Sequence, residues 1–235
     1  MNQPHKKPVI AFLGIGLMGA PMAIRLHEAG YRLRVWNRTM AKTAPLQAIG
    51  IDTVDSLQRA VASADIVITM LENGAIVKQV MAEVALFVAP ESLVIDMSST
   101  SQSEALDVHQ LLGNARIACL DAPVSGGMLG AAAGTLAIMV GGADAAFARA
   151  AEVFAVLGRA TRVGGAGTGQ VAKLCNQLIV GGTLNIVAEA LLLAQAAGAD
   201  PVAVRQALRG GFAESRILEV HGQRMLERNF MPGSG

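Results

Sequence analysis

Short apolar runs alternate with alanine-rich helical periods over most of the chain. The runs predict strands, the clearest at 9–13, 33–36, 66–70, 93–96, 117–121, 137–140 and 161–163. Helices predicted at 20–29, 40–49 and 147–157 each end at a glycine, the residue that most often follows a helix. Ser101 and Glu104 fit a capping box that opens a further helix.

Strands that are apolar throughout and joined by helices indicate a mainly parallel sheet covered on both faces. The prediction is an α/β fold, a doubly wound Rossmann-type domain at 1–164. The pattern changes after the glycine-rich segment 164–167, and the segment 170–197 then predicts one long interdomain helix. Asp200 and Pro201 predict the start of another helix, and 214–228 a further one. We therefore expect an all-helical C-terminal domain at 165–235.

Composition and charge narrow the class of protein. Hydrophobic residues make up 52% of the chain and charged residues 16%, enough for a sizeable core, and the net charge of +1 favours neither nucleic acid nor an anionic membrane. The apolar stretch 178–194 is long enough to span a membrane, but Asn185 and Glu189 favour a buried helix.

The cysteines and histidines add no metal or disulfide chemistry. Cys119 and Cys175 lie far apart, which predicts reduced, buried thiols in a cytoplasmic protein, and no secretory leader is expected at the N-terminus. The four histidines lack ligand spacing, so no metal site is expected.

A glycine-rich turn between the first predicted strand and helix suggests a dinucleotide site. A GxGxxG match alone is weak, but this position in a βα unit raises its value. Here the first glycine allows a tight turn, the second a close approach to pyrophosphate, and the third close helix–strand packing. A glycine-rich turn without a ligand is the alternative. The predicted cofactor-binding residues are Gly14, Ile15, Gly16, Leu17, Met18 and Gly19.

The next predicted strand bears on the choice of cofactor. NAD-specific proteins carry an acidic residue at its end for the ribose hydroxyls, whereas this chain has Asn37, Arg38 and Thr39. Arg38 could bind a 2′-phosphate, with Asn37 and Thr39 adding donors. The alternative is that Arg38 is a solvated loop cation. The sequence therefore predicts NADP, with NAD as the second choice.

Two loops that follow predicted strands offer groups to a bound ligand. The segment 96–99 contributes serine hydroxyls. The segment 121–127 places Ser125 ahead of Gly126 and Gly127, whose backbone N–H groups would form an anion cradle suited to a carboxylate. An ordinary turn is the alternative for this segment.

A lysine in the long predicted helix is the candidate acid–base group. Lys173, Asn176 and Gln177 share one helix face, which continues with apolar residues. Burial lowers the pKa of a lysine, which suits proton donation in one direction and acceptance in the other. A lysine at a helix edge with two polar neighbours is the alternative.

Together these motifs resemble the β-hydroxyacid dehydrogenase family. The matching segments are 14–19, 96–99, 121–127 and 167–177, in the same order and at similar separations. The resemblance implies hydride transfer between a nicotinamide and a small 3-hydroxy acid or semialdehyde carboxylate. It also implies that Lys173 protonates the alkoxide, that Asn176 and Gln177 assist, and that Ser125, Gly126 and Gly127 hold the carboxylate. Met70, Leu71 and Ser99 would contact the cofactor.

Within the family, the similarity is greatest to members that reduce tartronate semialdehyde to glycerate, with 210–215 and 228–233 also similar. Glyoxylate or succinic semialdehyde reduction and 3-hydroxyisobutyrate oxidation are alternatives, and 37–39 looks more like the NADPH-using reductases. An imine reductase is disfavoured by Lys173. A cofactor-binding module without turnover is the alternative from another class.

The family's helical domain commonly makes subunit contacts, which implies a homodimer or homotetramer. Relatives continue past the position of Pro232 and Gly233 with further helices that include a Lys-Asp motif. We therefore expect the second domain to be incomplete compared with theirs.

Overall fold

The computed structural model describes residues 7–230. The chain divides into two compact units, Met1–Lys173 and Leu174–Gly235, called here the first and second units. The predicted domains, 1–164 and 165–235, place their boundary slightly earlier, in the loop before the long helix α8 (Thr168–Ala196).

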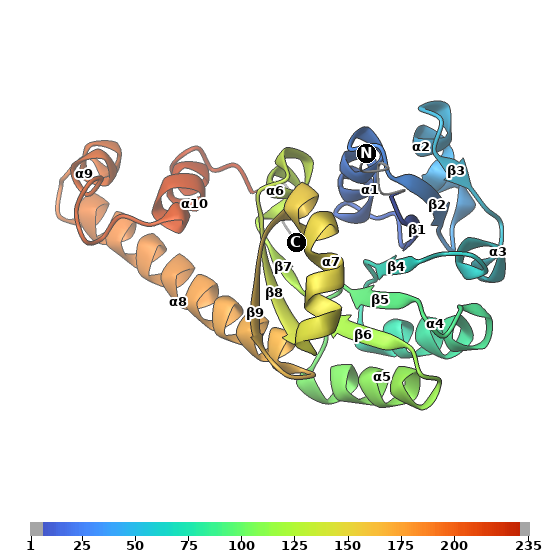
Figure 1. Cartoon of the computed structure of the whole chain (residues 1–235). Helices are drawn as coiled ribbons and strands as arrows, with labels where there is room; N and C mark the ends of the chain where they lie inside the picture. Colours follow the sequence, from blue (N-terminus) through green and yellow to red (C-terminus); the bar gives the residue numbers. More distant parts are fainter. Residues whose placement is uncertain (1–6, 231–235) are drawn as a thin grey trace, which may run out of the picture. The chain divides into compact units, whose positions relative to one another are not determined.

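The first unit is built on one sheet, which has the predicted doubly wound arrangement (Figure 1). Its path runs β3-β2-β1-β4-β5-β6-β8-β7, with β9 paired to β8. Strands β1 to β6 that neighbour one another are parallel, whereas β8 runs antiparallel to both β6 and β7. The strands are β1 (Val9–Leu13), β2 (Arg32–Trp36), β3 (Asp52–Thr53), β4 (Ile66–Thr69), β5 (Leu93–Asp96), β6 (Ala118–Asp121), β7 (Val124–Ser125), β8 (Leu136–Gly142) and β9 (Gly158–Gly164).

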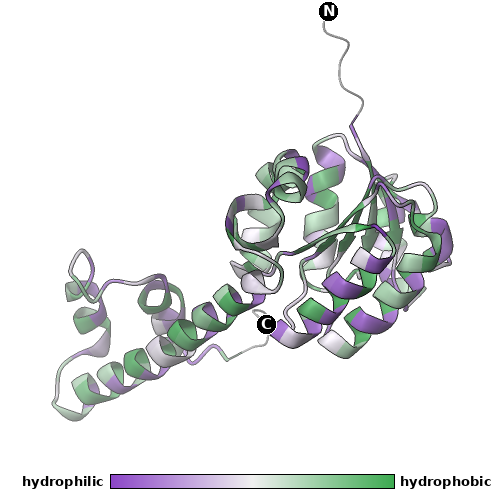
Figure 2. Ribbon diagram, turned by 60° about the horizontal axis from the view of Figure 1, so that its bottom comes forward, coloured by the Kyte–Doolittle hydropathy of each residue, from purple (hydrophilic) through white to green (hydrophobic). Residues whose placement is uncertain are grey.

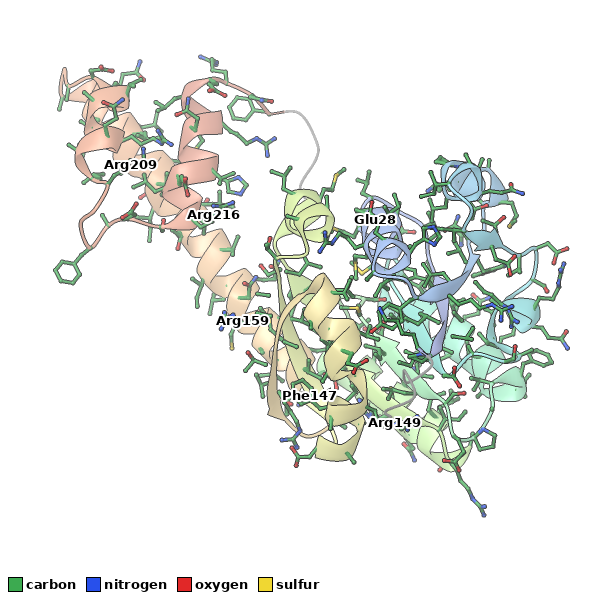
Figure 3. All side chains as sticks on the ribbon, turned by 45° about the horizontal axis from the view of Figure 1, so that its top comes forward. Glu28, Phe147, Arg149, Arg159, Arg209 and Arg216 are labelled. Atoms are coloured by element: carbon green, nitrogen blue, oxygen red, sulfur yellow. The ribbon has the colours of Figure 1, made fainter. Side chains whose placement is uncertain are left out.

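Helices cover both faces of this sheet, as the uniformly apolar strands predict. One core layer lies between the sheet and α1, α6 and α7, and the other between the sheet and α3, α4 and α5. Phe147 of α7, labelled in Figure 3, has its ring centroid 5.9 Å from that of Phe154 on the same helix. The helices are α1 (Gly19–Glu28), α2 (Ala44–Ala48), α3 (Leu57–Val61), α4 (Gly74–Phe87), α5 (Gln102–Asn114), α6 (Gly127–Ala133) and α7 (Asp144–Leu157).

Most predicted elements are confirmed, and the differences have local causes. The capping box of Ser101 and Glu104 is formed at the start of α5. The helix predicted at 40–49 is instead a 3₁₀ helix, Met40–Thr43, followed by α2. Pro45 lies in the first turn of α2, and a proline can begin an α-helix but cannot continue one without losing a backbone hydrogen bond.

The second unit contains the rest of α8 with α9 (Pro201–Ala207) and α10 (Arg216–Leu226). Its small core joins Val187 and Leu191 of α8 to Leu218 of α10. Arg205 of α9 donates hydrogen bonds to the carbonyl oxygens of Leu218 and Glu219, which fixes α9 to α10. Figure 3 marks Arg209 and Arg216, which lie in the segment around the α9–α10 connection.

Helix α8 exposes much of its apolar surface in the single chain. Many of its residues are hydrophobic (Figure 2), and only 17% of its most apolar stretch is buried. Among the described residues it is the one helix that could span a membrane by length and composition. The expectations of a buried helix here and of a buried Cys175 are therefore wrong for the isolated chain, in which Cys175 is exposed and Cys119 is buried. The exposed apolar side chains of α8 are Val171, Leu174, Leu178, Ile179, Ile186, Leu192 and Leu193.

Candidate active site

The glycine-rich turn follows β1 and opens α1, and its three glycines meet different surroundings. Gly14 has φ +102°, and a Cβ there would lie 2.3 Å from the carbonyl oxygen of Met70. A Cβ on Gly19 would lie 2.0 Å from the carbonyl oxygen of Gly14. A Cβ on Gly16 would meet nothing within 4 Å. The turn therefore needs the first and third glycines for its own packing and leaves open space at the second.

That open space lies where the glycine pattern predicts the pyrophosphate of a dinucleotide. It adjoins the start of α1, where backbone N–H groups and the helix dipole favour an anion. Leu17 is exposed and Met18 half-buried in the same turn, whereas Ile15 is buried in the core. The predicted roles of residues 14–19 toward the cofactor stay predictions, and buried Ile15 could offer only its backbone.

The end of β2 is joined to this turn by the side chain of Asn37. Its Oδ1 accepts a hydrogen bond from the backbone N–H of Ile15 (2.8 Å), and its Nδ2 donates to the carbonyl oxygen of Thr39 (2.9 Å). Both ends of the amide are therefore engaged within the protein. Arg38 and Thr39 are exposed beside it, in the loop where adenosine recognition is predicted.

A buried network joins the carboxyl ends of β4 and β5. Oδ1 of Asp96 accepts hydrogen bonds from the hydroxyl of Thr69 (2.8 Å) and the backbone N–H of Ser98 (3.1 Å). The Ser98 hydroxyl accepts from the N–H of Leu71 (2.9 Å). Burial raises the pKa of Asp96 to about 6, against the lowering effect of these hydrogen bonds. The network shapes the loop that contains Met70 and Leu71.

The two serines after β5 differ in exposure. Ser98 is fully buried, and its hydroxyl accepts the hydrogen bond from Leu71. The expectation that both hydroxyls of this loop can reach a ligand is therefore wrong for Ser98. Ser99 is exposed.

Ser125 and its two glycines lie where β7 passes into α6. Ser125 is half-buried, and Gly126 and Gly127 have φ of +139° and +61°. Successive backbone N–H groups in such a turn can form a concave anion site.

Lys173 reaches this segment from α8. Its Nζ donates a hydrogen bond to the carbonyl oxygen of Val124 (2.7 Å), the residue before Ser125. Burial lowers the pKa of Lys173 below the ordinary lysine value. The structure thus brings Lys173 to the predicted anion cradle through a direct contact with the preceding carbonyl.

Asn176 and Gln177 lie further along α8, in the second unit. The Nδ2 of Asn176 donates to Oε1 of Gln177 (2.9 Å). Their predicted roles toward the substrate stay predictions.

Sequence reasoning gave no role to three polar groups around the start of α8. Gln170 is fully buried; its Nε2 donates to the carbonyl oxygen of Ser98 and its Oε1 accepts from the N–H of Thr100. Asp121 and His109 form a second buried contact, 2.9 Å between Oδ1 and Nε2. One feature of the sequence could have indicated these contacts. Gly167 precedes α8 and has no side chain to cap it, so the first turn needs hydrogen-bond acceptors from elsewhere.

Two protein families match this chain. The NAD-binding domain of 6-phosphogluconate dehydrogenase matches residues 9–199. The NAD-binding region of NADP-dependent 3-hydroxyisobutyrate dehydrogenase matches residues 167–235.

The individual relatives are named as reductases or dehydrogenases of small hydroxy acids. A 2-hydroxy-3-oxopropionate reductase of Escherichia coli is 46% identical over 233 residues, which cover 95% of this chain and 78% of the relative. A probable 3-hydroxyisobutyrate dehydrogenase of Mycobacterium bovis is 42% identical over 190 residues, 80% of this chain and 65% of that protein. The structure of Mycobacterium tuberculosis 3-hydroxyisobutyrate dehydrogenase with L-serine has a TM-score of 0.85 and 37% identity, over 92% of this chain and 74% of that one.

Proposed function

Because the chain belongs to the β-hydroxyacid dehydrogenase family of NAD(P)-dependent enzymes, we propose that it reduces tartronate semialdehyde to glycerate with NADPH. The substrate assignment is supported by the 46% identity to a 2-hydroxy-3-oxopropionate reductase. Oxidation of 3-hydroxyisobutyrate is the second candidate, favoured by the M. bovis and M. tuberculosis relatives. We further propose that the protein is soluble, is located in the cytoplasm and forms a homodimer or homotetramer.

The observation that carries the proposal is the contact of Lys173 with Val124, 2.7 Å from the amine to the carbonyl oxygen. It supports a role for Lys173 as the acid that protonates the substrate oxygen, since Ser125, Gly126 and Gly127 follow at once and offer a hydroxyl and two N–H groups to a carboxylate. The cofactor, when bound, supplies a hydride to the carbonyl carbon. The alkoxide formed then takes a proton from Lys173.

The lowered pKa of Lys173 suits both directions of this reaction. A lower pKa makes the protonated lysine a stronger acid in reduction and leaves more of the neutral amine available as a base in oxidation. Asn176 and Gln177, one turn further along α8, would orient the amine and the substrate oxygen.

The cofactor would lie along the loops after β1, β2, β4 and β5. Gly14 to Gly19 would receive the pyrophosphate, and Met70, Leu71 and Ser99 would line the path to the nicotinamide. The preference for NADP is supported by exposed Arg38 and Thr39 after the end of β2, because residues 37–39 include no carboxylate for a ribose 2′-hydroxyl. Asn37 would act mainly by holding this loop to the glycine turn.

The test is NADPH oxidation by the wild type and Lys173→Ala with tartronate, succinic and methylmalonate semialdehydes and glyoxylate. We expect tartronate semialdehyde to give the highest kcat/KM, and Lys173→Ala to lower kcat by about 10²- to 10⁴-fold. Lys78→Ala is the matched control, because Lys78 is an exposed lysine paired with Asp107. Cofactor binding without turnover of any substrate would instead support a cofactor-binding module.

A further inference from the structure

Helix α8 begins without a capping side chain of its own. The residue before it is Gly167, and the hydroxyl of Thr168 donates back to the carbonyl oxygen of Gly165. The first N–H groups of a helix have no partner within the helix, and a buried helix start needs acceptors from elsewhere.

The carboxylate of Asp121, at the end of β6, supplies those acceptors. Its Oδ1 accepts from the N–H of Gly167 (2.8 Å) and its Oδ2 from the N–H of Gln170 (3.1 Å). Asp121 is almost fully buried, and its negative charge faces the positive end of the α8 dipole. The side chain of Asp121, from a strand, thus accepts the backbone hydrogen bonds that an N-cap side chain usually accepts.

Glycines make room for this arrangement on two sides. A Cβ on Gly141 would lie 2.6 Å from Oδ1 of Asp121, and a Cβ on Gly169 would lie 2.8 Å from its Oδ2. Gly169 would also clash with the Asp121 carbonyl oxygen at 2.4 Å. The carboxylate is therefore held in a fitted space between β8 and the first turn of α8.

His109 of α5 completes the contact. Its Nε2 lies 2.9 Å from Oδ1 of Asp121, and both side chains are largely buried. The other ionisable groups near Asp121 are Asp96, its register partner on β5, and the thiol of Cys119 on β6; burial raises the pKa of both. His109 is thus the one donor side chain that faces the carboxylate among the described residues.

We propose that Asp121, oriented by His109, is a positioning residue that fixes the first turn of α8 and so places the amine of Lys173 beside Val124. The catalytic consequence rests on the proposed role of Lys173. Lys173 follows Gln170 by three residues, less than one helical turn, so a shift of the first turn moves the lysine with it. Asp121 also lies three residues before Val124, so one carboxylate ties the lysine helix to the segment that accepts the lysine.

The direct test is the pKa of Lys173 in the cofactor-free full chain. The chain has five lysines, few enough for each ¹³C-dimethylated amine to be followed by NMR during a pH titration, with Lys173→Arg to assign the signal. We expect Asp121→Asn to move the Lys173 midpoint upward, because the released turn lets water reach the amine. Loss of the negative charge alone would move it downward, so a lower or unchanged midpoint overturns the proposal.

His109 offers a second pair of variants, in case Asp121→Asn does not fold. His109→Gln keeps an N–H donor near the position of Nε2, whereas His109→Leu removes it and keeps the charge of Asp121. We expect His109→Leu to raise the Lys173 midpoint and His109→Gln to leave it close to the wild type. Equal midpoints in the two variants would overturn the role of His109.

Kinetics then connect the geometry to turnover. A misplacement of about 1 Å can cost about 10²-fold in rate, so we expect Asp121→Asn to lower kcat by about 10- to 100-fold and to leave the KM for NADPH nearly unchanged. A higher KM with an unchanged kcat would contradict a positioning role. The NMR result stands whether or not the wild type turns over a semialdehyde, so it separates failure of this proposal from failure of the proposed function.

Discussion

The side-chain oxygen of Asn37 accepts a 2.8 Å hydrogen bond from the backbone N–H of Ile15, so the end of β2 holds the glycine-rich turn that follows β1. Two segments predicted to contact one cofactor are thereby joined before any cofactor binds. An aspartate at position 37 could accept the same hydrogen bond and would add a carboxylate where NAD-specific proteins have one.

Asn37→Asp would keep the hydrogen bond from Ile15 but lose the one to the Thr39 carbonyl oxygen. We therefore expect this variant to fold with a somewhat lower melting temperature and to shift the preference from NADPH toward NADH. Repulsion between a carboxylate and a 2′-phosphate should lower the ratio of kcat/KM for NADPH to that for NADH by at least about tenfold, equivalent to about 1.4 kcal/mol. Arg38→Ala should lower the same ratio. Steady-state kinetics with both cofactors measure it, and a wild type that already prefers NADH would refute the NADP assignment.

Gly16 and Gly19 separate cofactor binding from folding. Because a Cβ on Gly16 meets open space, Gly16→Ala should keep the melting temperature of the wild type and still weaken NADPH binding by about tenfold or more, since a methyl group would occupy the predicted pyrophosphate position. Gly19→Ala should lower the melting temperature, because its Cβ would lie 2.0 Å from a backbone oxygen.

Calorimetric titration with NADPH and thermal unfolding measure the two effects. Gly182→Ala, in α8 and also facing open space, is the control for NADPH binding. Unchanged NADPH affinity in Gly16→Ala would place the pyrophosphate elsewhere.

Asp96 gives the stability of the fold a specific pH dependence. Burial raises its pKa from 3.8 to about 6, so the folded chain binds this proton more tightly than the unfolded chain. The resulting stabilisation is present at low pH and is lost as the pH rises through about 6; at 1.36 kcal/mol per unit it reaches at most about 3 kcal/mol.

Asp96→Asn cannot titrate, so its free energy of unfolding should fall less between pH 4 and pH 7 than that of the wild type. Urea unfolding at a series of pH values measures the difference. Asp52→Asn, at an exposed position, is the control and should follow the wild type. The same slope in wild type and Asp96→Asn would show that Asp96 does not titrate in this range.

Ser125 is expected to bind the substrate carboxylate and not the cofactor. Loss of a hydrogen bond to a charged group costs about 1.5–3 kcal/mol, so Ser125→Ala should raise the KM for the semialdehyde by about 10- to 100-fold. The KM for NADPH should change little. Ser125→Thr, which keeps the hydroxyl, is the matched variant, and equal KM values in Ser125→Ala and wild type would remove Ser125 from the site.

The pH dependence of turnover should follow the protonation of Lys173. Burial lowers its pKa, and the proposed reduction would use the protonated amine, so kcat for reduction should fall as the pH rises through a value below the ordinary pKa of lysine. The reverse oxidation should gain in kcat over the same range. Rate profiles in both directions check this, and a reduction rate that stays flat up to the ordinary lysine pKa would contradict it.

The sequence predicted the elements whose causes are local. The bounds of β1 and β5 follow from uniformly apolar runs, and the start of α5 follows from Ser101 and Glu104. The Gly14 and Gly19 contacts agree with the predicted use of these glycines in the turn.

What the sequence could not predict depends on contacts between distant segments. The two-residue strand β7 forms because Val124 pairs with Ile138 of an antiparallel β8, and no local pattern specifies that register. The contact of Asp121 with Gly167 and Gln170 bridges more than forty residues of sequence. The hydrogen bond between Asn37 and Ile15 could not be predicted either, because the sequence shows only that a polar residue follows a strand.

Product formation tests the proposed activity most directly. The wild-type chain, with NADPH and tartronate semialdehyde, should form one glycerate for each NADPH oxidised, and Lys173→Ala should form almost none while still binding NADPH. If the wild type binds NADPH but neither oxidises it nor forms a hydroxy acid from any semialdehyde in the panel, the assignment of this chain as a semialdehyde reductase is wrong.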